Sequence, residues 1–307
     1  MAAWEGFSIR KRKAIPAGIW MKCDGCAKMV IRKDVEQAQW VCPECNYHFR
    51  LSSFQRINML LDDGSFQEMY ADLEPADPLN FEFRGGTTYT ERYKRDQLAT
   101  GLKDAARVGV GTLCGDEVAF GVTDSRFLMG SMGSVVGEKL TRIIEYATRE
   151  KLPLVIVSGS GGGARMHEGV LSLCQMAKTA AALGRYRDAG GFFASVLTNP
   201  TMGGVAASFA SLGDVVLAEP KALIGFAGPR TIWHTLQVEL PEGFQTSEFL
   251  VEHGFLDMVV SRKELRDTLS RLVNFCVIRG SRKDKQLREA AARRAEARTQ
   301  EGAHVGL

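Results

Sequence analysis

Apolar runs alternate with glycine-rich turns and helical patterns over most of the chain beyond residue 100. The runs 107–113 and 117–123 flank a short polar turn, a pattern that predicts a β-hairpin. Beyond it we expect buried strands at 152–157, 192–198 and 214–218, and helices at 135–151, 164–186, 205–212, 230–239, 246–253 and 263–278. Strand, turn and helix recurring in this order favour an α/β fold in which crossover helices join parallel strands.

The segments before residue 101 are shorter and more polar. Residues 51–61 have apolar positions at helical spacing, whereas residues 62–100 are interrupted by Pro75 and Pro78. We therefore predict five parts: a basic leader 1–18, a cysteine-rich module 19–50, a connecting segment with short helices 51–100, the α/β domain 101–280 and a charged tail 281–307. The tail contains helix-forming residues but no apolar stripe.

The composition is that of a globular protein. Of 307 residues, 45% are hydrophobic and 24% are charged, which allows a sizeable core. No apolar run reaches the roughly 18 residues that a membrane span needs. The first residues lack the apolar core of a secretory signal, and the seven cysteines are an odd number. These features predict a reducing, cytoplasmic location.

Charge adds information only near the N-terminus. The net charge of +3 is too small to indicate a nucleic-acid-binding protein. Residues 1–50, however, carry nine Lys and Arg against five Asp and Glu, including the basic run 10–13. This excess is typical of a solvated leader, but it also fits an electrostatic patch for an acidic partner such as RNA. Both interpretations stay open.

Two Cys-x2-Cys pairs separated by fifteen residues predict a metal centre. Each pair lies on a tight turn that contains Gly25 or Pro43, and we expect short strands within the stretch 29–40. Two such turns direct four thiolates at one point, as in tetrahedral zinc sites. The predicted ligands of one structural zinc ion are Cys23, Cys26, Cys42 and Cys45. Because four thiolates leave no open coordination position, the ion is expected to stabilise the fold rather than to catalyse.

The other cysteines and the histidine beside the metal centre are expected to play no part in it. Cys114, Cys174 and Cys276 are scattered, and we predict that they are small buried apolar residues. His48 follows Cys45 closely, but four cysteines already complete the site. We therefore expect His48 on the surface.

Two glycine turns, 158–166 and 201–205, follow neighbouring predicted strands. The first contains the G-x-G-x-x-A pattern of dinucleotide sites, but the next strand ends at Thr198 without the acidic residue that binds a ribose. Neither a P-loop nor a G-x-S-x-G elbow occurs. Glycines between a strand and a helix leave backbone N–H groups exposed, and such groups can stabilise an oxyanion. Helix capping and tight packing are the alternative explanation.

Several motifs together resemble one enzyme family. They are Gly130-Ser-Met-Gly-Ser-Val-Val-Gly137, Gly162-Gly-Ala-Arg-Met166, Thr201-Met-Gly-Gly-Val205, Glu219-Pro-Lys-Ala-Leu-Ile-Gly-Phe-Ala-Gly-Pro-Arg230 and Pro241-Glu-Gly-Phe-Gln245. With the four-cysteine module, they make residues 10–275 similar to the β subunits of bacterial and plastid acetyl-CoA carboxylase carboxyltransferase.

The resemblance implies a crotonase-like spiral of ββα units behind a zinc ribbon. It implies transfer of a carboxyl group from carboxybiotin to acetyl-CoA, which yields malonyl-CoA in the first committed step of fatty-acid synthesis. The implied partners are an α subunit in an α2β2 assembly, biotin carboxylase, and a biotin carboxyl carrier protein that supplies biotin in trans. The chain itself has no Met-Lys-Met biotinylation site.

The resemblance also implies a mechanism without a side-chain base. The ureido nitrogen of biotin removes the acetyl α-proton, and backbone N–H groups stabilise the oxyanions. We assign that role to the N–H groups of Gly162, Gly163, Gly203 and Gly204. Arg165 and Arg230 are candidates for contacts with a substrate phosphate or a partner, and structural ion pairs are the alternative for both.

Two other functions stay open. A stand-alone acyl-CoA hydrolase or decarboxylase of the same fold would need a positioned acid or base near the glycine turns. A nucleic-acid-binding regulator would instead use the zinc ribbon and the basic leader.

Overall fold

The computed structural model describes residues 18–276, and the chain divides between Phe49 and Arg50 into two compact units. The predicted tail 281–307, and all but the last residue of the predicted leader 1–18, lie outside the described residues.

The first unit is a small module around the cysteine pairs. Strands β1 (Trp20–Lys22) and β2 (Met29–Ile31) pair antiparallel, and helix α1 (Arg32–Gln37) follows directly. The prediction of strands over 29–40 was therefore right only for β2, because the polar residues after it form a helix that buries Val35. The core of the module consists of the buried side chains Cys23, Val30, Val35, Cys42 and Phe49.

The second unit is built on one mixed sheet. Its strands are β3 (Gln67–Met69), β4 (Ala106–Leu113), β5 (Asp116–Thr123), β6 (Leu154–Ser160), β7 (Phe193–Met202), β8 (Val215–Ala218), β9 (Ile224–Gly225) and β10 (Met258–Val259). Their spatial order is β10-β8-β7-β6-β5-β4-β3, with β9 beside the end of β7. The predicted hairpin is confirmed, because β4 and β5 pair antiparallel from end to end. From β5 to β10 the neighbouring strands are parallel, as the strand–turn–helix repeats predicted.

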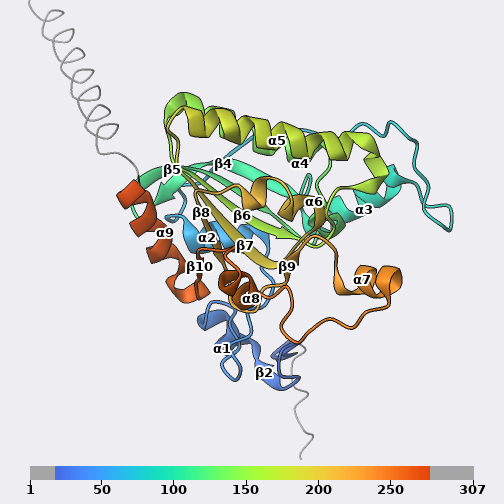
Figure 1. Cartoon of the computed structure of the whole chain (residues 1–307), viewed down its shortest axis with the longest axis horizontal. Helices are drawn as coiled ribbons and strands as arrows, with labels where there is room; N and C mark the ends of the chain where they lie inside the picture. Colours follow the sequence, from blue (N-terminus) through green and yellow to red (C-terminus); the bar gives the residue numbers. More distant parts are fainter. Residues whose placement is uncertain (1–17, 277–307) are drawn as a thin grey trace, which may run out of the picture. The chain divides into compact units, whose positions relative to one another are not determined.

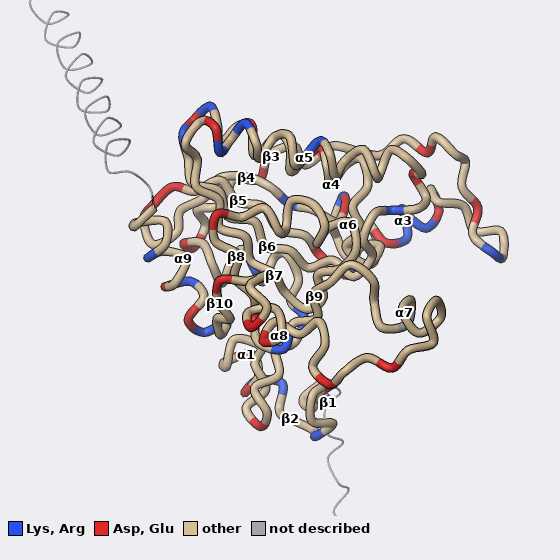
Figure 2. Tube along the Cα trace, viewed as in Figure 1, with Lys and Arg blue, Asp and Glu red and all other residues tan. Residues whose placement is uncertain are grey.

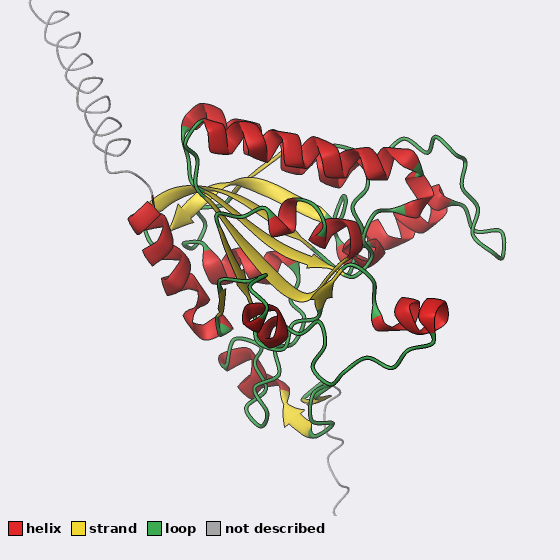
Figure 3. Ribbon diagram, viewed as in Figure 1, coloured by secondary structure: helices red, strands yellow, loops and turns green. Residues whose placement is uncertain are grey.

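Helices cover both faces of this sheet (Figures 1 and 3). Helices α4 (Ser134–Glu150) and α5 (Val170–Asp188) lie side by side on one face, and α3 (Tyr89–Thr100) joins the same core. Helices α2 (Ser53–Leu60) and α9 (Arg262–Cys276) pack against the other face and form a second core. Each face of the sheet is thus buried under its own helices, as parallel sheets require.

The remaining helices are short. They are α6 (Gly203–Ala206), α7 (Pro229–Leu236), α8 (Ser247–Glu252) and the 3-10 turns η1 (Leu128–Gly130), η2 (Met166–Glu168) and η3 (Phe209–Ser211). Lys and Arg lie interspersed with Asp and Glu along the described chain (Figure 2). Within residues 18–276, no helix has both the length and the apolar character needed to cross a membrane.

Three predicted elements differ from the observed ones. Strand β7 does not stop at Thr198 but continues to Met202, because its last residues pair with β9. The helix predicted at 205–212 is only α6 and the turn η3. The helix predicted from residue 164 begins at Val170, after a 3-10 turn and Gly169, whose φ of 55° interrupts helical geometry.

The polar segment 62–100 is more than a connection. Strand β3 adds an antiparallel edge to the sheet beside β4. Helix α3 begins at a capping box formed by Thr88 and Glu91 and ends at Gly101 in the left-handed conformation. Its buried side chains belong to the main core, so α3 is an integral part of the second unit.

The prediction for the scattered cysteines was wrong. Cys114 and Cys174 are exposed, and Cys276 is half-buried. Cys114 lies in the hairpin turn with a φ of 51°, and Cys174 lies on the outer side of α5. Apolar character alone therefore did not predict burial at these positions.

Candidate active site and metal centre

The two glycine turns meet in the folded chain. The first follows β6, and the second joins β7 to α6. A Cβ atom added to Gly203 would lie 2.9 Å from Cα of Gly163, and one added to Gly163 would lie 3.3 Å from N of Gly204. Gly163 and Gly203 also adopt left-handed φ angles of 59° and 62°. Only glycine combines a left-handed φ with the lack of a side chain. The close approach of the two turns therefore explains why both positions are glycine.

Not every amide of the first turn is available to a ligand. The N–H groups of Gly161 and Gly162 both donate to the carbonyl of Met129, at 2.9 and 3.1 Å. Within residues 18–276, the N–H groups of Gly163 and Ala164 donate no hydrogen bond. Gly204 lies in the first turn of α6, where an amide has no intrahelical acceptor. The geometry therefore favours Gly163, Ala164 and Gly204 as donors.

This set differs from the predicted one in three ways, since it leaves out Gly162 and Gly203 and adds Ala164. Gly203 also lies in the first turn of α6, but Gly204 is the residue whose amide lies 3.3 Å from a Cβ on Gly163, inside the junction. The amide of Gly162 is already bonded, so Gly162 shapes the turn rather than offering its N–H group. Ala164 was missed, because the sequence pattern draws attention to glycines although any residue supplies a backbone amide. The amide of Ala164 lies 3.2 Å from the point where a Cβ on Gly204 would stand.

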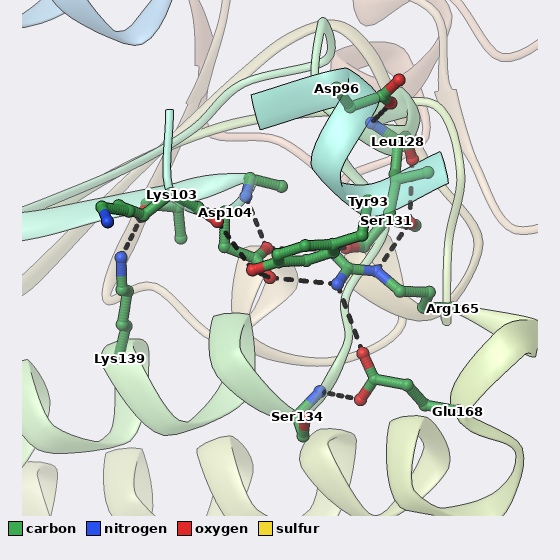
Figure 4. A network of polar contacts seen from close by, with 12 residues as sticks. Tyr93, Asp96, Lys103, Asp104, Leu128, Ser131, Ser134, Lys139, Arg165 and Glu168 are labelled. Carbon is green, nitrogen blue, oxygen red and sulfur yellow. Dashed lines mark hydrogen bonds and ion pairs between the residues drawn. The ribbon is translucent and has the colours of Figure 1, made fainter. Parts of the chain in front are cut away.

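A buried polar network lies directly behind the first turn (Figure 4). The guanidinium of Arg165 is 1% exposed and donates to both carboxylate oxygens of Asp104, at 2.8 and 3.1 Å. It also donates to the Ser131 hydroxyl and carbonyl, to the Tyr89 hydroxyl and to Glu168. Burial opposes the charged form of Arg165, but the carboxylate of Asp104 outweighs it and raises the pKa above its ordinary value.

Glu168 links this network to helix α4. One of its oxygens accepts from the Tyr89 hydroxyl at 2.7 Å, and the other accepts from the backbone N–H of Ser134, also at 2.7 Å. Ser134 is the first residue of α4, so the carboxylate lies at the positive end of a long helix. Burial raises the pKa of Tyr89, which therefore keeps its proton and acts as a donor.

The structure describes the side chain of only one of the two arginines that were predicted to contact a phosphate or a partner. Arg165 is saturated with buried partners, so the structure favours the ion-pair alternative over contact with a phosphate. Arg230 belongs to α7, and its side chain lies outside what the structure describes.

The four predicted zinc ligands come together. The sulfur atoms of Cys23, Cys26, Cys42 and Cys45 all lie within 4.8 Å of one another. The Sγ atoms of Cys23 and Cys45 are 3.6 Å apart. Tetrahedral thiolates at about 2.3 Å from zinc stand roughly 3.8 Å apart, so this cluster has the dimensions of a metal site.

The residues around the cysteine cluster show that the prediction for His48 was wrong and why a glycine occupies position 25. His48 is 4% exposed, and its Nδ1 lies 3.1 Å from the carbonyl of Asn46, so it is a buried residue rather than a surface one. A Cβ on Gly25 would lie 2.7 Å from Cβ of Tyr47. Gly25 therefore allows the first cysteine turn to pack closely.

Comparison with known proteins agrees with this architecture. Residues 48–262 match the family model described as the carboxyl transferase domain. The chain is 59% identical over 266 residues to acetyl-coenzyme A carboxylase carboxyl transferase subunit beta of Rhodopirellula baltica, covering 87% of this chain and 85% of that protein. It is 50% identical over 272 residues to the chloroplastic subunit beta of Pyropia yezoensis, covering 88% and 93%.

Solved structures share the fold at low sequence identity. Transcarboxylase 12S matches with a TM-score of 0.60 and 22% identity, over 78% of this chain and 43% of that one. A chain of the Pseudomonas malonate decarboxylase MdcD-MdcE hetero-dimer matches with a TM-score of 0.55 and 22% identity, over 78% and 95%.

The fold and the matched domain define a carboxyl transferase enzyme of the crotonase-like class. The predicted fold class is thereby confirmed. Within that class, the chain belongs to the family of acetyl-CoA carboxylase carboxyl transferase β subunits. The resemblance that the motifs indicated is confirmed over most of the chain.

Proposed function

We propose that the chain transfers a carboxyl group from carboxybiotin to acetyl-CoA and forms malonyl-CoA, the first committed step of fatty-acid synthesis. The observation that carries this proposal is the junction of the two glycine turns. There, among the described residues, the N–H groups of Gly163 and Ala164 donate no hydrogen bond, and Gly204 lies in the first helical turn of α6, where an amide has no intrahelical acceptor. The three amides lie close together. Such a junction suits a reaction in which negative charge develops on a carbonyl oxygen.

The backbone amides have a defined part in this reaction. When the α-carbon of acetyl-CoA loses a proton, charge moves to the thioester oxygen, and the amides of the junction stabilise it. The turns are already fixed by close packing, so little reorganisation is needed. Carboxybiotin supplies CO2, and its ureido nitrogen accepts the α-proton as the new carbon–carbon bond forms. The chain therefore needs no side-chain base at this point.

The carboxyl donor must come from another protein. The printed sequence has no Met-Lys-Met biotinylation site, and the relatives are named as one subunit of a carboxylase. We infer that the chain works with an α subunit in an α2β2 assembly, with a biotin carboxyl carrier protein and with biotin carboxylase.

The four-cysteine cluster is proposed to bind one structural Zn2+. Four sulfur ligands at tetrahedral spacing are the donor set that zinc prefers, and they leave no position for a substrate. The ion would stabilise a module whose own apolar core is very small.

The test is malonyl-CoA formation by purified subunits. The chain, the matching α subunit, biotin carboxylase, the carrier protein, ATP and bicarbonate are mixed with acetyl-CoA, and malonyl-CoA is measured by mass spectrometry. We expect product only when this chain and the α subunit are both present. A well-folded complete mixture that forms none would contradict the proposal.

The same preparation tests the stand-alone alternative. A hydrolase or decarboxylase would release CoA or CO2 from acyl-CoA substrates with this chain alone. We expect no such turnover, because among the described residues the atoms nearest Gly162, Gly163, Gly203 and Gly204 belong to the backbone and to side chains that are neither acids nor bases.

A further inference from the structure

Helix α3 presents three polar side chains on one face. Tyr89, Tyr93 and Asp96 follow each other at intervals of four and three residues, which places them on the same side of a helix. They are 1%, 6% and 8% exposed, whereas most other residues of α3 are exposed or half-buried. Buried polar groups need partners, and all three find them near the first glycine turn.

The two tyrosines reach the two carboxylates that hold Arg165. The Tyr89 hydroxyl donates to Glu168 at 2.7 Å and accepts from Arg165 at 3.1 Å. The Tyr93 hydroxyl lies 3.0 Å from Asp104 and 2.6 Å from the carbonyl of Lys103. Each carboxylate partner of the guanidinium is therefore itself bonded from α3.

Arg165 lies within the first glycine turn, directly after Ala164. Its backbone N–H donates to the carbonyl of Met132 at 2.9 Å, and the N–H of Met132 donates to the carbonyl of Gly163 at 2.7 Å. The side chain of Arg165 fixes the same strand of backbone through Ser131. Movement of Arg165 would therefore move the residues that carry the free amides.

Asp96 holds the opposite side of the turn. Its carboxylate accepts from the backbone N–H of Leu128 at 3.0 Å. The next residue, Met129, provides the carbonyl that binds the amides of Gly161 and Gly162. Leu128 and Met129 have φ angles of 42° and 58°, an unfavourable conformation that persists only when surrounding contacts enforce it. Figure 4 shows Asp96 beside Leu128, above the Arg165 cluster.

We propose that Tyr89, Tyr93 and Asp96 are positioning residues for carboxyl transfer. Through Arg165 on one side and Met129 on the other, α3 keeps the turn in the geometry that exposes the amides of Gly163 and Ala164. In this proposal the three side chains act through the turn and not by contact with the substrate. This inference rests on the proposed function of the glycine-turn junction.

The test compares near-isosteric variants with a matched control. Tyr89→Phe removes the hydroxyl that bonds both Glu168 and Arg165. Asp96→Asn weakens the bond to the Leu128 N–H, because a neutral amide oxygen is a poorer acceptor than a carboxylate. Tyr186→Phe is the control, because Tyr186 is equally buried and its hydroxyl bonds the carbonyls of Leu152 and Phe192, away from the turn. We expect kcat to fall about 10-fold in the first two variants, with KM for acetyl-CoA changed less than about 2-fold, since small misplacements slow the reaction rather than weaken binding. Tyr186→Phe should keep the wild-type kcat.

A second measurement does not depend on activity. Amide hydrogen–deuterium exchange is followed in the peptide covering residues 158–166, where Gly161 and Gly162 are bonded to Met129. Exchange there should accelerate in Tyr89→Phe and Asp96→Asn, and not in Tyr186→Phe.

The possible failures are distinguishable. Wild-type kcat and unchanged exchange in Tyr89→Phe and Asp96→Asn would overturn the positioning role, as would equal losses in Tyr186→Phe. If the wild-type mixture forms no malonyl-CoA, the proposed function fails instead, and the exchange data then decide alone whether α3 holds the turn.

Discussion

Single residues at the turn junction are constrained more tightly than their small size indicates. Gly163 faces Gly204, and any side chain on Gly163 would enter the space between the turns. Its φ of 59° also disfavours every residue except glycine. Gly184, about one turn before the end of α5, has open space around it and an ordinary helical backbone.

These two glycines provide the first prediction. Gly163→Ala should lower kcat for malonyl-CoA formation about 100-fold, because the added methyl group pushes the turns apart. Gly184→Ala should keep kcat and raise the free energy of unfolding by about 0.5–1 kcal/mol, since alanine is the better helix former. Steady-state kinetics and urea unfolding measure both quantities. Equal kcat values in the two variants would show that the junction does not matter to the reaction.

His167 provides a prediction about pH. Its ring stacks on Tyr89 with centroids 5.3 Å apart. Burial, and then the positive charge of Arg165, lower its pKa, while Glu168 opposes this effect. The folded chain therefore keeps His167 neutral at a pH where the unfolded chain already binds a proton, and stability is lost as the pH falls below about 6.5.

The measurement compares the wild type with His167→Gln in urea unfolding. The stability of the wild type relative to the variant should fall between about pH 7.5 and about pH 5.5, because glutamine does not titrate. A difference that stays constant over this range would mean that the pKa of His167 is not shifted by folding.

Sequence patterns located some of these residues and not others. The cysteines and glycines were found because each set has its own spacing or motif. Asp104 and Tyr89 were missed, since they lie far from Arg165 in sequence and belong to no motif. Only the folded chain brings them to the guanidinium, so no local pattern could have indicated their role.

At the scale of elements, the helix and strand boundaries that were predicted wrongly are the ones that depend on contacts between residues far apart in the sequence. The helical pattern after residue 164 continues without a break in hydrophobicity, yet the chain forms a turn there because the Arg165 side chain is drawn into the buried network. Likewise, β7 extends through Pro200 because β9 pairs with its end. The α/β repeats themselves were predicted correctly, since their periodicity is local.

A buried ion triad connects three elements of the second unit. Glu219, which follows β8, binds Arg56 of α2 and Arg262 of α9. Burial would raise the pKa of Glu219, but the charge of Arg56 and then that of Arg262 outweigh it and hold the pKa well below its ordinary value. The triad stabilises the fold above the unfolded pKa of a glutamate, and this stability is lost as the pH falls.

We therefore expect Glu219→Gln to lower the free energy of unfolding by about 3–5 kcal/mol at neutral pH, because it leaves two buried guanidiniums without their charge partner. The matched control is Glu150→Gln, which removes an exposed pair with Arg149 and should cost less than about 1 kcal/mol. Urea unfolding at neutral pH measures the free energy of unfolding of both variants. A loss for Glu219→Gln no larger than that of the control would contradict a stabilising role for the triad.

The cysteine module provides a prediction about metal content. The purified chain should contain about one zinc ion. Cys23→Ser should lower the zinc content and destabilise the module, because three thiolates hold the ion less well. Cys114→Ser is the control, since Cys114 is exposed and outside the cluster. Elemental analysis by mass spectrometry gives the number of zinc ions per chain. Normal zinc content in Cys23→Ser would refute the assignment.

The described part of this module gives no support to RNA binding. Residues 18–49 carry equal numbers of positive and negative side chains. The positive ones are Lys22, Lys28, Arg32 and Lys33, and the negative ones are Asp24, Asp34, Glu36 and Glu44. The basic run 10–13 lies outside the described residues. Binding of RNA therefore stays a prediction from the sequence alone.

For the whole molecule, the sheet and its helices act as a frame that brings distant turns together. Parallel strands β6 and β7 end at the same edge, so the turns that follow them become neighbours. The frame supplies backbone amides and fixed packing, while the activated carboxyl group is expected from partner proteins. This division explains why a chain with few candidate acids and bases can belong to an enzyme family.

The central claim is that the junction of the two turns binds the reacting thioester oxygen. A crystal structure of the complex with the α subunit and a non-hydrolysable acetyl-CoA analogue tests it most directly. We expect the oxygen that replaces the thioester carbonyl within about 2.7–3.1 Å of at least one of the amides of Gly163, Ala164 and Gly204. An analogue bound in reactive alignment with that oxygen remote from all three amides would contradict the account.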